Sequence, residues 1–295
     1  MKIPDHGRFA YSPIGERRTY DWPGGARLAV YIAINVERFA FAKGIGHLIS
    51  VENQPPDQRG HAWRDYGNRV GIWRMLDMLD ELDLPACHLI NSSIFEYAPS
   101  VPKAIMARGD EFVGHGRTNA ERQGQMWEDD ERRLIEEARD IIAHETGRSP
   151  RGWMGPWISE SFVTPDLLQE AGYTFIMDWP CDDQPFWMAT RNGRIMSVPY
   201  SIDLNDATQQ IHHHHTPQAY GDMLIDRFDE MKRQSRKQPL VCPIPLHPML
   251  TGQPQRILHL RRALKHMRDN SDGVWFTRPG EIYDHCAALA EGIVP

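Results

Sequence analysis

An almost unbroken apolar run at residues 26–36 constrains the fold more than any other feature of this sequence. The run is rich in β-branched residues, and its length and composition are typical of a strand buried on both faces of a parallel sheet. It ends at Glu37 and Arg38, which mark the carboxyl end of the predicted strand. The sequence therefore predicts a parallel sheet whose first strand starts near residue 26.

The rest of the chain alternates predicted strands with predicted helices. Apolar spacing and end signals predict helices at residues 66–82, 99–108, 123–144, 164–172, 217–235 and 256–267, and from residue 279 onward. Thr164 is expected to cap the helix that ends near Gly172. Short apolar runs predict strands at residues 86–90, 111–114, 152–156, 173–177, 195–199, 240–246 and 274–276. This alternation indicates an α/β fold that closes or nearly closes into a barrel, with functional side chains at the strand ends.

Composition, charge and cysteine content disfavour several classes of protein. With 41% hydrophobic and 25% charged residues, the chain has the composition of a globular protein rather than a disordered or coiled-coil one. Its formal net charge of -7 disfavours nucleic acid as a partner. The 4 cysteines form no CxxC pair, which suits a reducing compartment better than a disulfide framework.

No segment has the pattern of a signal peptide, a membrane span or a linker. The amino terminus lacks an apolar segment after its basic residue, and no apolar run approaches the roughly 18 residues of a transmembrane helix. Glycine and proline are spread along the chain instead of marking a boundary. We therefore expect a single domain over residues 1–295, located in the cytoplasm, with no membrane partner and with assembly into a homo-oligomer.

Polar and ionisable side chains follow the predicted strands and would meet at one rim of a barrel. They are Glu37, Asn91, His115 with Asn119, Trp153 with Pro156, Asp178 with Trp179, and His247. Any one of them alone is more often a helix cap or a solvated loop residue than a catalyst. As a set, they indicate a functional site at that rim.

Five segments carry a family resemblance. In chain order they are NVER at residues 35–38, HGRTN at 115–119, RGWMGP at 151–156, DW at 178–179 and LHP at 246–248. They resemble the motifs of the polysaccharide deacetylase superfamily, the carbohydrate esterase family 4 group. The resemblance implies a distorted (β/α)7 barrel with the site at the carboxyl ends of the strands.

Two motif positions depart from the family pattern, and both concern its metal. The family's first motif places an Asp base before an Asp metal ligand, whereas this chain has Glu37, which can do the same proton chemistry, followed by the cation Arg38. The second motif supplies two His ligands, whereas here Asn119 follows His115, and an amide oxygen is a poor zinc ligand. We therefore expect activity that requires no metal. The alternative is one divalent ion such as zinc on Glu37, His115 and His247.

Three further segments narrow the resemblance to one branch. RDYGNRVG at residues 64–71, PYSIDLND at 199–206 and HPMLTGQPQR at 247–256 look like the allantoinase-like branch. Its members hydrolyse C–N bonds in small cyclic ureides, and cyclic imide hydrolases are close to it. The resemblance implies a hydrolase that opens a small cyclic amide by attack of water on a ring carbonyl. Such chemistry needs a base, an oxyanion stabiliser and an acid for the leaving nitrogen.

The motif positions suggest how this chemistry is divided among side chains. Glu37 is the predicted base, His247 the acid or oxyanion partner, and His115 a second polar anchor. Asp178 is expected to hold a neighbouring imidazole in one orientation. The candidate substrate-binding residues are Asn119, Arg151, Trp153, Pro156, Trp179 and Asn205.

Other readings of the sequence stay open. The alternative functions are an N-deacetylase acting on a sugar or peptidoglycan fragment, and a catalytically inactive family member that binds a ligand. The four histidines at residues 212–215 favour a loop that is solvated or borders the site over a metal site. A turn explains Asp182 and Asp183 as well as acid–base chemistry does, and no histidine is tied to Cys181 as a base. The tryptophans at positions 153, 157, 179 and 187 fit core packing and stacking walls about equally.

Overall fold

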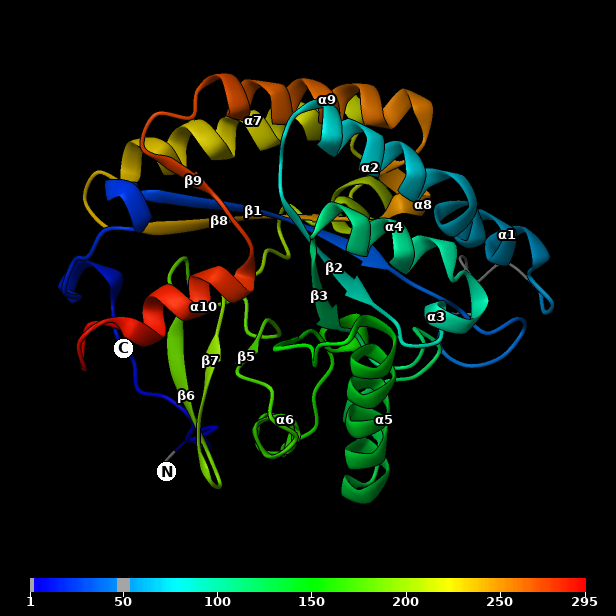
Figure 1. Cartoon of the computed structure of the whole chain (residues 1–295), viewed down its shortest axis with the longest axis horizontal. Helices are drawn as coiled ribbons and strands as arrows, with labels where there is room; N and C mark the ends of the chain where they lie inside the picture. The colour runs from blue at the N-terminus through cyan, green and yellow to red at the C-terminus, as the bar shows by residue number, and fades with distance from the viewer. Residues whose placement is uncertain (1–2, 47–53) are drawn as a thin grey trace.

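The computed structural model describes residues 3–46 and 54–295, and its centre is one curled sheet (Figure 1). The strands lie in the order β6-β7-β5-β4-β3-β2-β1-β8, with β9 beside the start of β1. They are parallel except for the antiparallel pair of β6 and β7. The strands are β1 (Leu28–Val36), β2 (Ala86–Ile90), β3 (Glu111–Gly114), β4 (Gly152–Trp153), β5 (Phe175–Ile176), β6 (Phe186–Thr190), β7 (Gly193–Ser197), β8 (Leu240–Leu246) and β9 (Val274–Phe276).

Helices such as α7 (Pro217–Gln234) and α9 (Pro254–Asp269) pack against the outer face of this sheet, whereas α10 (Pro279–Ala288) packs against its inner core. α7 and α9 lie side by side next to β1 and β8 (Figure 1). Further helices are α1 (Gln58–Tyr66), α2 (Ile72–Glu81), α3 (Ile94–Tyr97), α4 (Ser100–Arg108), α5 (Glu128–Thr146), α6 (Thr164–Glu170) and α8 (Pro248–Thr251). Within the described ranges, no helix combines the length and the apolar character that crossing a membrane requires.

β1 is buried along its whole length, as its apolar run predicts. Side chains alternate between the two faces of a strand, so each face of β1 needs its own cover. The even-numbered residues belong to the outer core that the helices complete, whereas Ala29, Tyr31 and Ala33 belong to the inner core of the barrel. The same alternation directs Asn35 and Glu37 inward at the carboxyl end of the strand.

The helical segment before β2 begins at Gln58 rather than at residue 66. α1 is mostly polar, so it lacks the apolar spacing that marks a helix in a sequence. Its amino end is capped by the carboxylate of Asp57, which accepts a hydrogen bond of 2.9 Å from the amide of Gly60. A π-helical turn at Gly67–Gly71 then joins α1 to α2.

Two glycines let this π-helical turn touch the segment that follows β8. A Cβ atom on Gly67 would lie 2.6 Å from the backbone nitrogen of Met249, and one on Gly71 would lie 2.0 Å from the carbonyl oxygen of Pro248. No side chain fits at such distances, so glycine is required at both positions. The turn therefore packs directly on the residues after His247.

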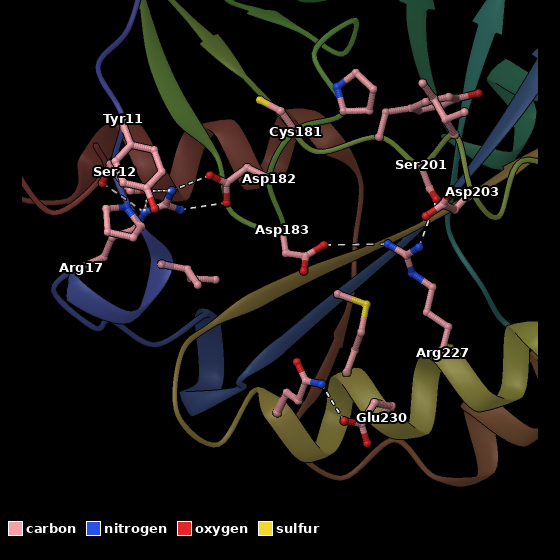
Figure 2. Close-up of a pocket in the computed structure, with 17 residues that line it drawn as sticks. Tyr11, Ser12, Arg17, Cys181, Asp182, Asp183, Ser201, Asp203, Arg227 and Glu230 are labelled. Atoms are coloured by element: carbon pink, nitrogen blue, oxygen red, sulfur yellow. Dashed lines mark hydrogen bonds and ion pairs between the residues drawn. The ribbon is translucent and has the colours of Figure 1, made fainter.

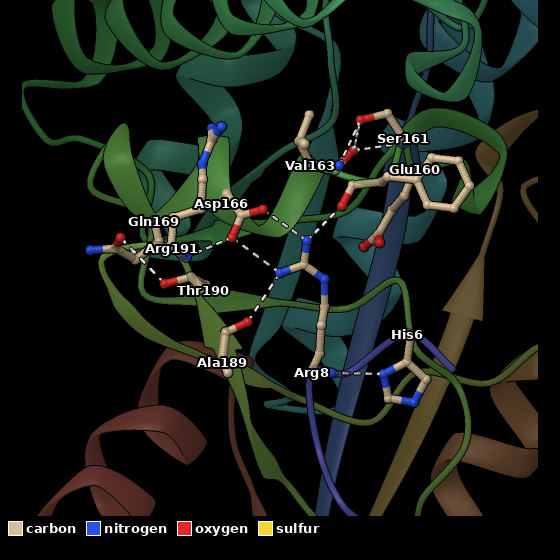
Figure 3. A network of polar contacts seen from close by, with 12 residues as sticks. His6, Arg8, Glu160, Ser161, Val163, Asp166, Gln169, Ala189, Thr190 and Arg191 are labelled. Carbon is tan, nitrogen blue, oxygen red and sulfur yellow. Dashed lines mark hydrogen bonds and ion pairs between the residues drawn. The ribbon is translucent and has the colours of Figure 1, made fainter. Parts of the chain in front are cut away.

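β6 is the strand that the sequence analysis does not predict. Asn192-Gly193 between two apolar runs is a strong hairpin signal that would have revealed it. Arg8 ties the amino-terminal segment to this hairpin, because its guanidinium donates hydrogen bonds to the carboxylate of Asp166 and to the carbonyl oxygen of Ala189 (Figure 3).

α5 and α6 begin differently from the prediction. α5 starts at Glu128, since residues 123–125 form a separate 3-10 turn. Thr164 is the first residue of α6 and not its cap. Its hydroxyl accepts a hydrogen bond of 2.8 Å from the amide of Ser161 and donates to the buried carboxylate of Glu131.

Candidate active site

A cavity of about 390 Å³ lies at the carboxyl ends of β1, β3 and β8. Glu37 reaches it after β1, His115 and Asn119 after β3, and His247 after β8. Asn205 also contributes to its wall, as the sequence predicts for a substrate-binding residue. The apolar and aromatic part of the wall includes Phe39, Trp63, Met154, Trp157, Ile211 and Met249.

Glu37 is the side chain on which the polar groups of the cavity converge. Its Oε1 accepts a hydrogen bond of 2.5 Å from Asn119 Nδ2. The Nε2 atoms of His115 and His247 lie 3.4 and 3.6 Å from the same oxygen. Burial alone would raise the pKa of Glu37, but the attraction of His247 and the hydrogen bonds of both imidazoles lower it well below its usual range. Glu37 is therefore an ionised carboxylate.

His247 is held in one orientation by Asp206. Its Nδ1 donates to Asp206 Oδ1 at 2.6 Å, and its own amide donates to Asp206 Oδ2 at 2.8 Å. The hydroxyl of Thr251 is a third donor to this fully buried carboxylate. Burial opposes the charged imidazole, but Asp206 and Glu37 outweigh it and raise the pKa of His247 to about 10. His247 is thus an imidazolium at neutral pH.

His115 is oriented by a backbone carbonyl group. Its Nδ1 lies 2.6 Å from the carbonyl oxygen of Met154, and because a carbonyl only accepts, Nδ1 must carry the hydrogen. The Nε2 atom of His115 points into the cavity and lies 3.4 Å from Oε1 of Glu37.

The amide group of Asn119 points its NH₂ end at Glu37, and the surrounding hydrogen bonds fix this assignment. Asn91 Oδ1 accepts from the backbone amide of Arg38 at 2.8 Å, so Asn91 Nδ2 faces the other way and donates to the carbonyl oxygen of His115. The same Nδ2 donates to Asn119 Oδ1 at 3.0 Å. Asn119 Nδ2 is consequently left for Glu37, and the oxygen of Asn119 is already engaged.

This donor set does not fit a divalent metal. Within the described part of the chain, no three His, Cys, Asp or Glu side chains are grouped so that they could hold a metal ion. Asn119 donates an amide hydrogen to Glu37 where the family's motif has an imidazole ligand. Arg38 turns away, stacks 4.5 Å from the centre of the Tyr97 ring and donates to the carbonyl oxygen of Ser93. Arg38 therefore does not block the metal position with its charge, but it also does not supply the carboxylate that the family's motif has there.

Two predicted site residues after β5 have other partners. Asp178, which was expected to hold an imidazole, instead accepts a hydrogen bond of 2.8 Å from the amide of Gly155. Asp206 has the role that was predicted for Asp178. Trp179 lies outside the cavity and donates from Nε1 to the carboxylate of Glu160 at 3.0 Å.

Three further predicted residues also lie outside the cavity lining. Arg151 stands at the amino end of β4, where its guanidinium pairs with Asp284 at 2.6 Å. Trp153 is fully buried in the core and donates to Gln123 Oε1 at 3.1 Å. Pro156 is buried as well, whereas its neighbour Trp157 reaches the cavity wall.

A larger cavity of about 860 Å³ holds the remaining candidates (Figure 2). Asp182 pairs with Arg17, and Asp183 lies 3.9 Å from Arg227, so both aspartates have structural partners. Burial and the neighbouring Asp182 raise the pKa of the Cys181 thiol, which disfavours a thiolate nucleophile. Among the residues described, these three side chains therefore have no activating partner in this cavity.

Sequence reasoning missed two residues of the site and left the histidine run open. Asp206 falls within a segment that shows the family resemblance, but nothing in the sequence links it to His247. Arg64 lies on the polar helix α1 and lines the cavity. Of the four histidines at residues 212–215, His212 borders the cavity, and the next three are exposed.

The chain is similar to known proteins over nearly its whole length. No family model matches the sequence. A Schizosaccharomyces pombe protein provisionally described as a polysaccharide deacetylase is 24% identical over 90% of this chain and 91% of its own length. A peptidoglycan deacetylase of Helicobacter pylori is 22% identical over 84% of this chain and 93% of its own length.

Two solved structures share the architecture. A Pseudomonas aeruginosa PAO1 protein, again provisionally described as a polysaccharide deacetylase, has a TM-score of 0.81 and 26% identity over 96% of both chains. The PuuE allantoinase has a TM-score of 0.79 and 27% identity over 95% of both chains. The chain therefore has the polysaccharide deacetylase fold of carbohydrate esterase family 4, as its five sequence motifs predict.

Proposed function

We propose that this protein is a hydrolase that opens a small cyclic amide, an imide or a ureide, by attack of water on a ring carbonyl. The observation that carries the proposal is the pairing of ionised Glu37 with the imidazolium of His247 in one cavity. A facing carboxylate and imidazolium supply the base and the acid that hydrolysis of a C–N bond requires. In this proposal the reaction needs no metal.

In the proposed reaction, Glu37 accepts a proton from the water molecule whose oxygen bonds to the ring carbonyl carbon. The C–N bond then breaks, and His247 donates its proton to the leaving nitrogen, which yields a carboxylic acid and an N–H group. Proton transfer from Glu37 to His247 restores the starting state. A ring that enters between the two side chains weakens their attraction, so the pKa of Glu37 rises and the carboxylate becomes a stronger base.

The size and the walls of the cavity favour a small, flat substrate. A volume of about 390 Å³ suits one small ring, and aromatic walls such as Phe39 and Trp157 suit a planar one. Trp157 has a left-handed backbone, with φ of 65°, and its Nε1 donates to the carbonyl oxygen of Asn119 at 2.9 Å. The aromatic wall at Trp157 is thus bonded to Asn119, which orients Glu37. The likeness to the PuuE allantoinase supports a cyclic substrate, and the likeness to a peptidoglycan deacetylase supports the alternative, N-deacetylation of a sugar.

One set of assays tests both activities. Purified protein is incubated with allantoin, hydantoin, dihydrouracil, succinimide and maleimide, and in parallel with chitin oligomers. Ring opening is followed by chromatography, acetate release by a coupled enzymatic assay, and Glu37→Gln protein is the matched control. Ring opening that the control lacks supports the proposal. Acetate release without ring opening would replace it with N-deacetylation, and neither reaction would indicate an inactive family member.

A further inference from the structure

Arg64 brings a positive charge to the wall of the catalytic cavity. The residue lies on α1 and lines this cavity together with Glu37 and Phe39, and the same three residues line a smaller cavity of about 360 Å³ beside it. Its guanidinium carbon lies 4.0 Å from the centre of the Phe39 ring. The side chain is only partly accessible to solvent. The cation is therefore held by an aromatic face at the side of the cavity.

This cation has no carboxylate bound to it in the part of the chain that the structure describes. Arg64 Nε is buried without a hydrogen-bond partner, and Glu37 and Asp57 attract the guanidinium only through longer-range electrostatics. The partly buried guanidinium of Arg8, for comparison, lies 2.9 Å from the carboxylate of Asp166. Because a partly buried cation without a partner is unfavourable, its presence in the cavity indicates that a ligand supplies the missing anion.

We propose that Arg64 binds a carboxylate group of the substrate, so that the ring opened by this protein carries an anionic substituent. A guanidinium that stacks on a phenyl ring keeps the donors along its edge free, and this edge matches the two oxygens of a carboxylate. The inference rests on the proposed function for the ring, but the charge of the ligand follows from Arg64 alone.

The position of Arg64 also limits where the carboxylate sits on the ring. Glu37 is ionised and repels an anion, so the carboxylate must lie on the side of Arg64 and Phe39. The carbonyl group that is attacked must then lie at the other end, between Glu37 and His247. The substrate is a cyclic amide whose carboxylate and scissile bond are on opposite sides of the ring.

Pairs of rings that differ only in the acidic group test this inference. Wild-type protein, Arg64→Met and Arg64→Lys are compared on dihydrouracil against dihydroorotate, and on hydantoin against hydantoin-5-acetate. Met keeps the aliphatic contact with Phe39 and removes the charge. Arg69→Met is the matched control, because Arg69 is exposed on the following turn and pairs with Asp65 at 2.6 Å. Arg64→Gln replaces Arg64→Met if the latter does not melt cooperatively.

We expect wild-type protein to prefer the carboxylated ring at least about tenfold in kcat/KM, and Arg64→Met to reduce this preference about 30-fold or more. Arg64→Lys restores part of the preference, and Arg69→Met leaves it unchanged. A wild-type preference for the neutral ring, or equal losses on both rings in Arg64→Met, would overturn the inference.

A binding measurement separates this inference from the proposed function. Calorimetric titration of Glu37→Gln protein, with and without Arg64→Met, reports affinity without turnover. If no ring is opened but the carboxylated ring binds and Arg64→Met abolishes that binding, the ring-opening function fails and the role of Arg64 stands. If rings are opened and Arg64→Met leaves the affinity for the carboxylated ring unchanged, the function stands and the role of Arg64 fails. Absence of binding by every carboxylated ring also overturns the role of Arg64.

Discussion

Two groups of buried carboxyl side chains lie near the carboxyl ends of the strands. The first group is Glu37 with Asp206, and the second is Asp178 with Glu160. The pKa of Glu37 is lowered, whereas the pKa values of the second group are raised. Burial raises the pKa of any carboxyl group. At Glu37 two imidazoles outweigh burial, so the pKa falls below its usual range. At Asp178 burial is joined by the like charge of Glu160, so the pKa of Asp178 rises well above its usual range, and burial raises the pKa of Glu160 to about 7. The first group supplies a base, whereas burial favours the protonated form of both carboxyl groups in the second.

The comparison shows that position at a strand end does not make a carboxyl group catalytic. Asp178 and Asp206 are both buried and both accept backbone hydrogen bonds, from Gly155 and His247 respectively. Only Asp206 also contacts an imidazole. The charge of the neighbouring group decides whether a buried carboxyl group takes part in proton chemistry.

The largest expected effect comes from removing the charge of Glu37. Glu37→Gln keeps the shape of the side chain but cannot accept the proton of water, so ring opening should fall by about 10²–10⁴ while the fold is retained. Kinetics on the best ring of the panel, with circular dichroism to check the fold, measure this. Retention of more than about a tenth of the wild-type rate, with unchanged binding, would remove Glu37 from the role of base.

The same substitution in both groups sharpens the comparison. Asp206→Asn removes the charge that holds His247 protonated, so kcat/KM should fall about 100-fold. The pKa of His247 should also fall from about 10, so the loss of activity at alkaline pH should begin at a lower pH. Asp178→Asn exchanges a protonated acid for a neutral amide and should change the rate less than about twofold. The pH–rate profiles of both variants measure this. An equal loss of kcat/KM in Asp206→Asn and Asp178→Asn would show that Asp206 has no special role in the reaction.

The second group should affect stability rather than rate. The pKa of Glu160 is about 7 in the folded protein against 4.5 in the unfolded chain, so the unfolded chain loses its proton first as the pH rises. The free energy of unfolding should therefore fall between pH 4.5 and pH 7, by roughly 2–3 kcal/mol, because each pKa unit corresponds to 1.36 kcal/mol. Glu160→Gln should weaken this dependence in thermal melting at pH 5 and pH 8, and the raised pKa of Asp178 should preserve the remainder. A variant with the wild-type dependence on pH would contradict the assignment.

The smallest expected effect is that of chelation. If His247 rather than a metal neutralises Glu37, prolonged chelation should change activity less than about twofold. The protein must be prepared without an affinity tag, since the histidines at residues 212–215 can scavenge nickel or zinc, and elemental analysis should accompany the assay. The opposite result would be near-stoichiometric metal whose removal abolishes activity, with activity restored by added zinc or cobalt. That result would make Glu37, His115 and His247 metal ligands.

The barrel and the centre of the site follow from strand patterns. The apolar runs that become β1 and β8 predict these strands closely, and strand alternation then accounts for the inward direction of Glu37. β4 and β5 have only 2 residues each. Trp153 at the end of β4 and Asp178 after β5 were predicted for the rim, but Trp153 is buried in the core and Asp178 is hydrogen-bonded to the amide of Gly155. Short strands carry too little pattern to indicate direction.

The partners of the central residues could not be predicted from the sequence. Asp206 follows an irregular segment, and its contact with His247 depends on how that segment crosses the end of the barrel. Arg64 lies on a helix without an apolar stripe, so the sequence does not show which face turns to the cavity. Both contacts are products of tertiary packing, which periodicity alone does not encode.

The contact of Gly67 and Gly71 with the backbone after His247 has a consequence for engineering. The helix that carries Arg64 and the segment that carries the acid are joined without intervening side chains, so neither can be shifted to admit a bulkier ring without displacing the other. Trp157 follows β4 and lines the same cavity, and among the residues described no glycine of its segment packs against the backbone beside His247. Variants that retarget the cavity should therefore be sought around Trp157, and libraries that mutate Gly67 or Gly71 should yield mostly proteins that have lost the acid and the anion site together.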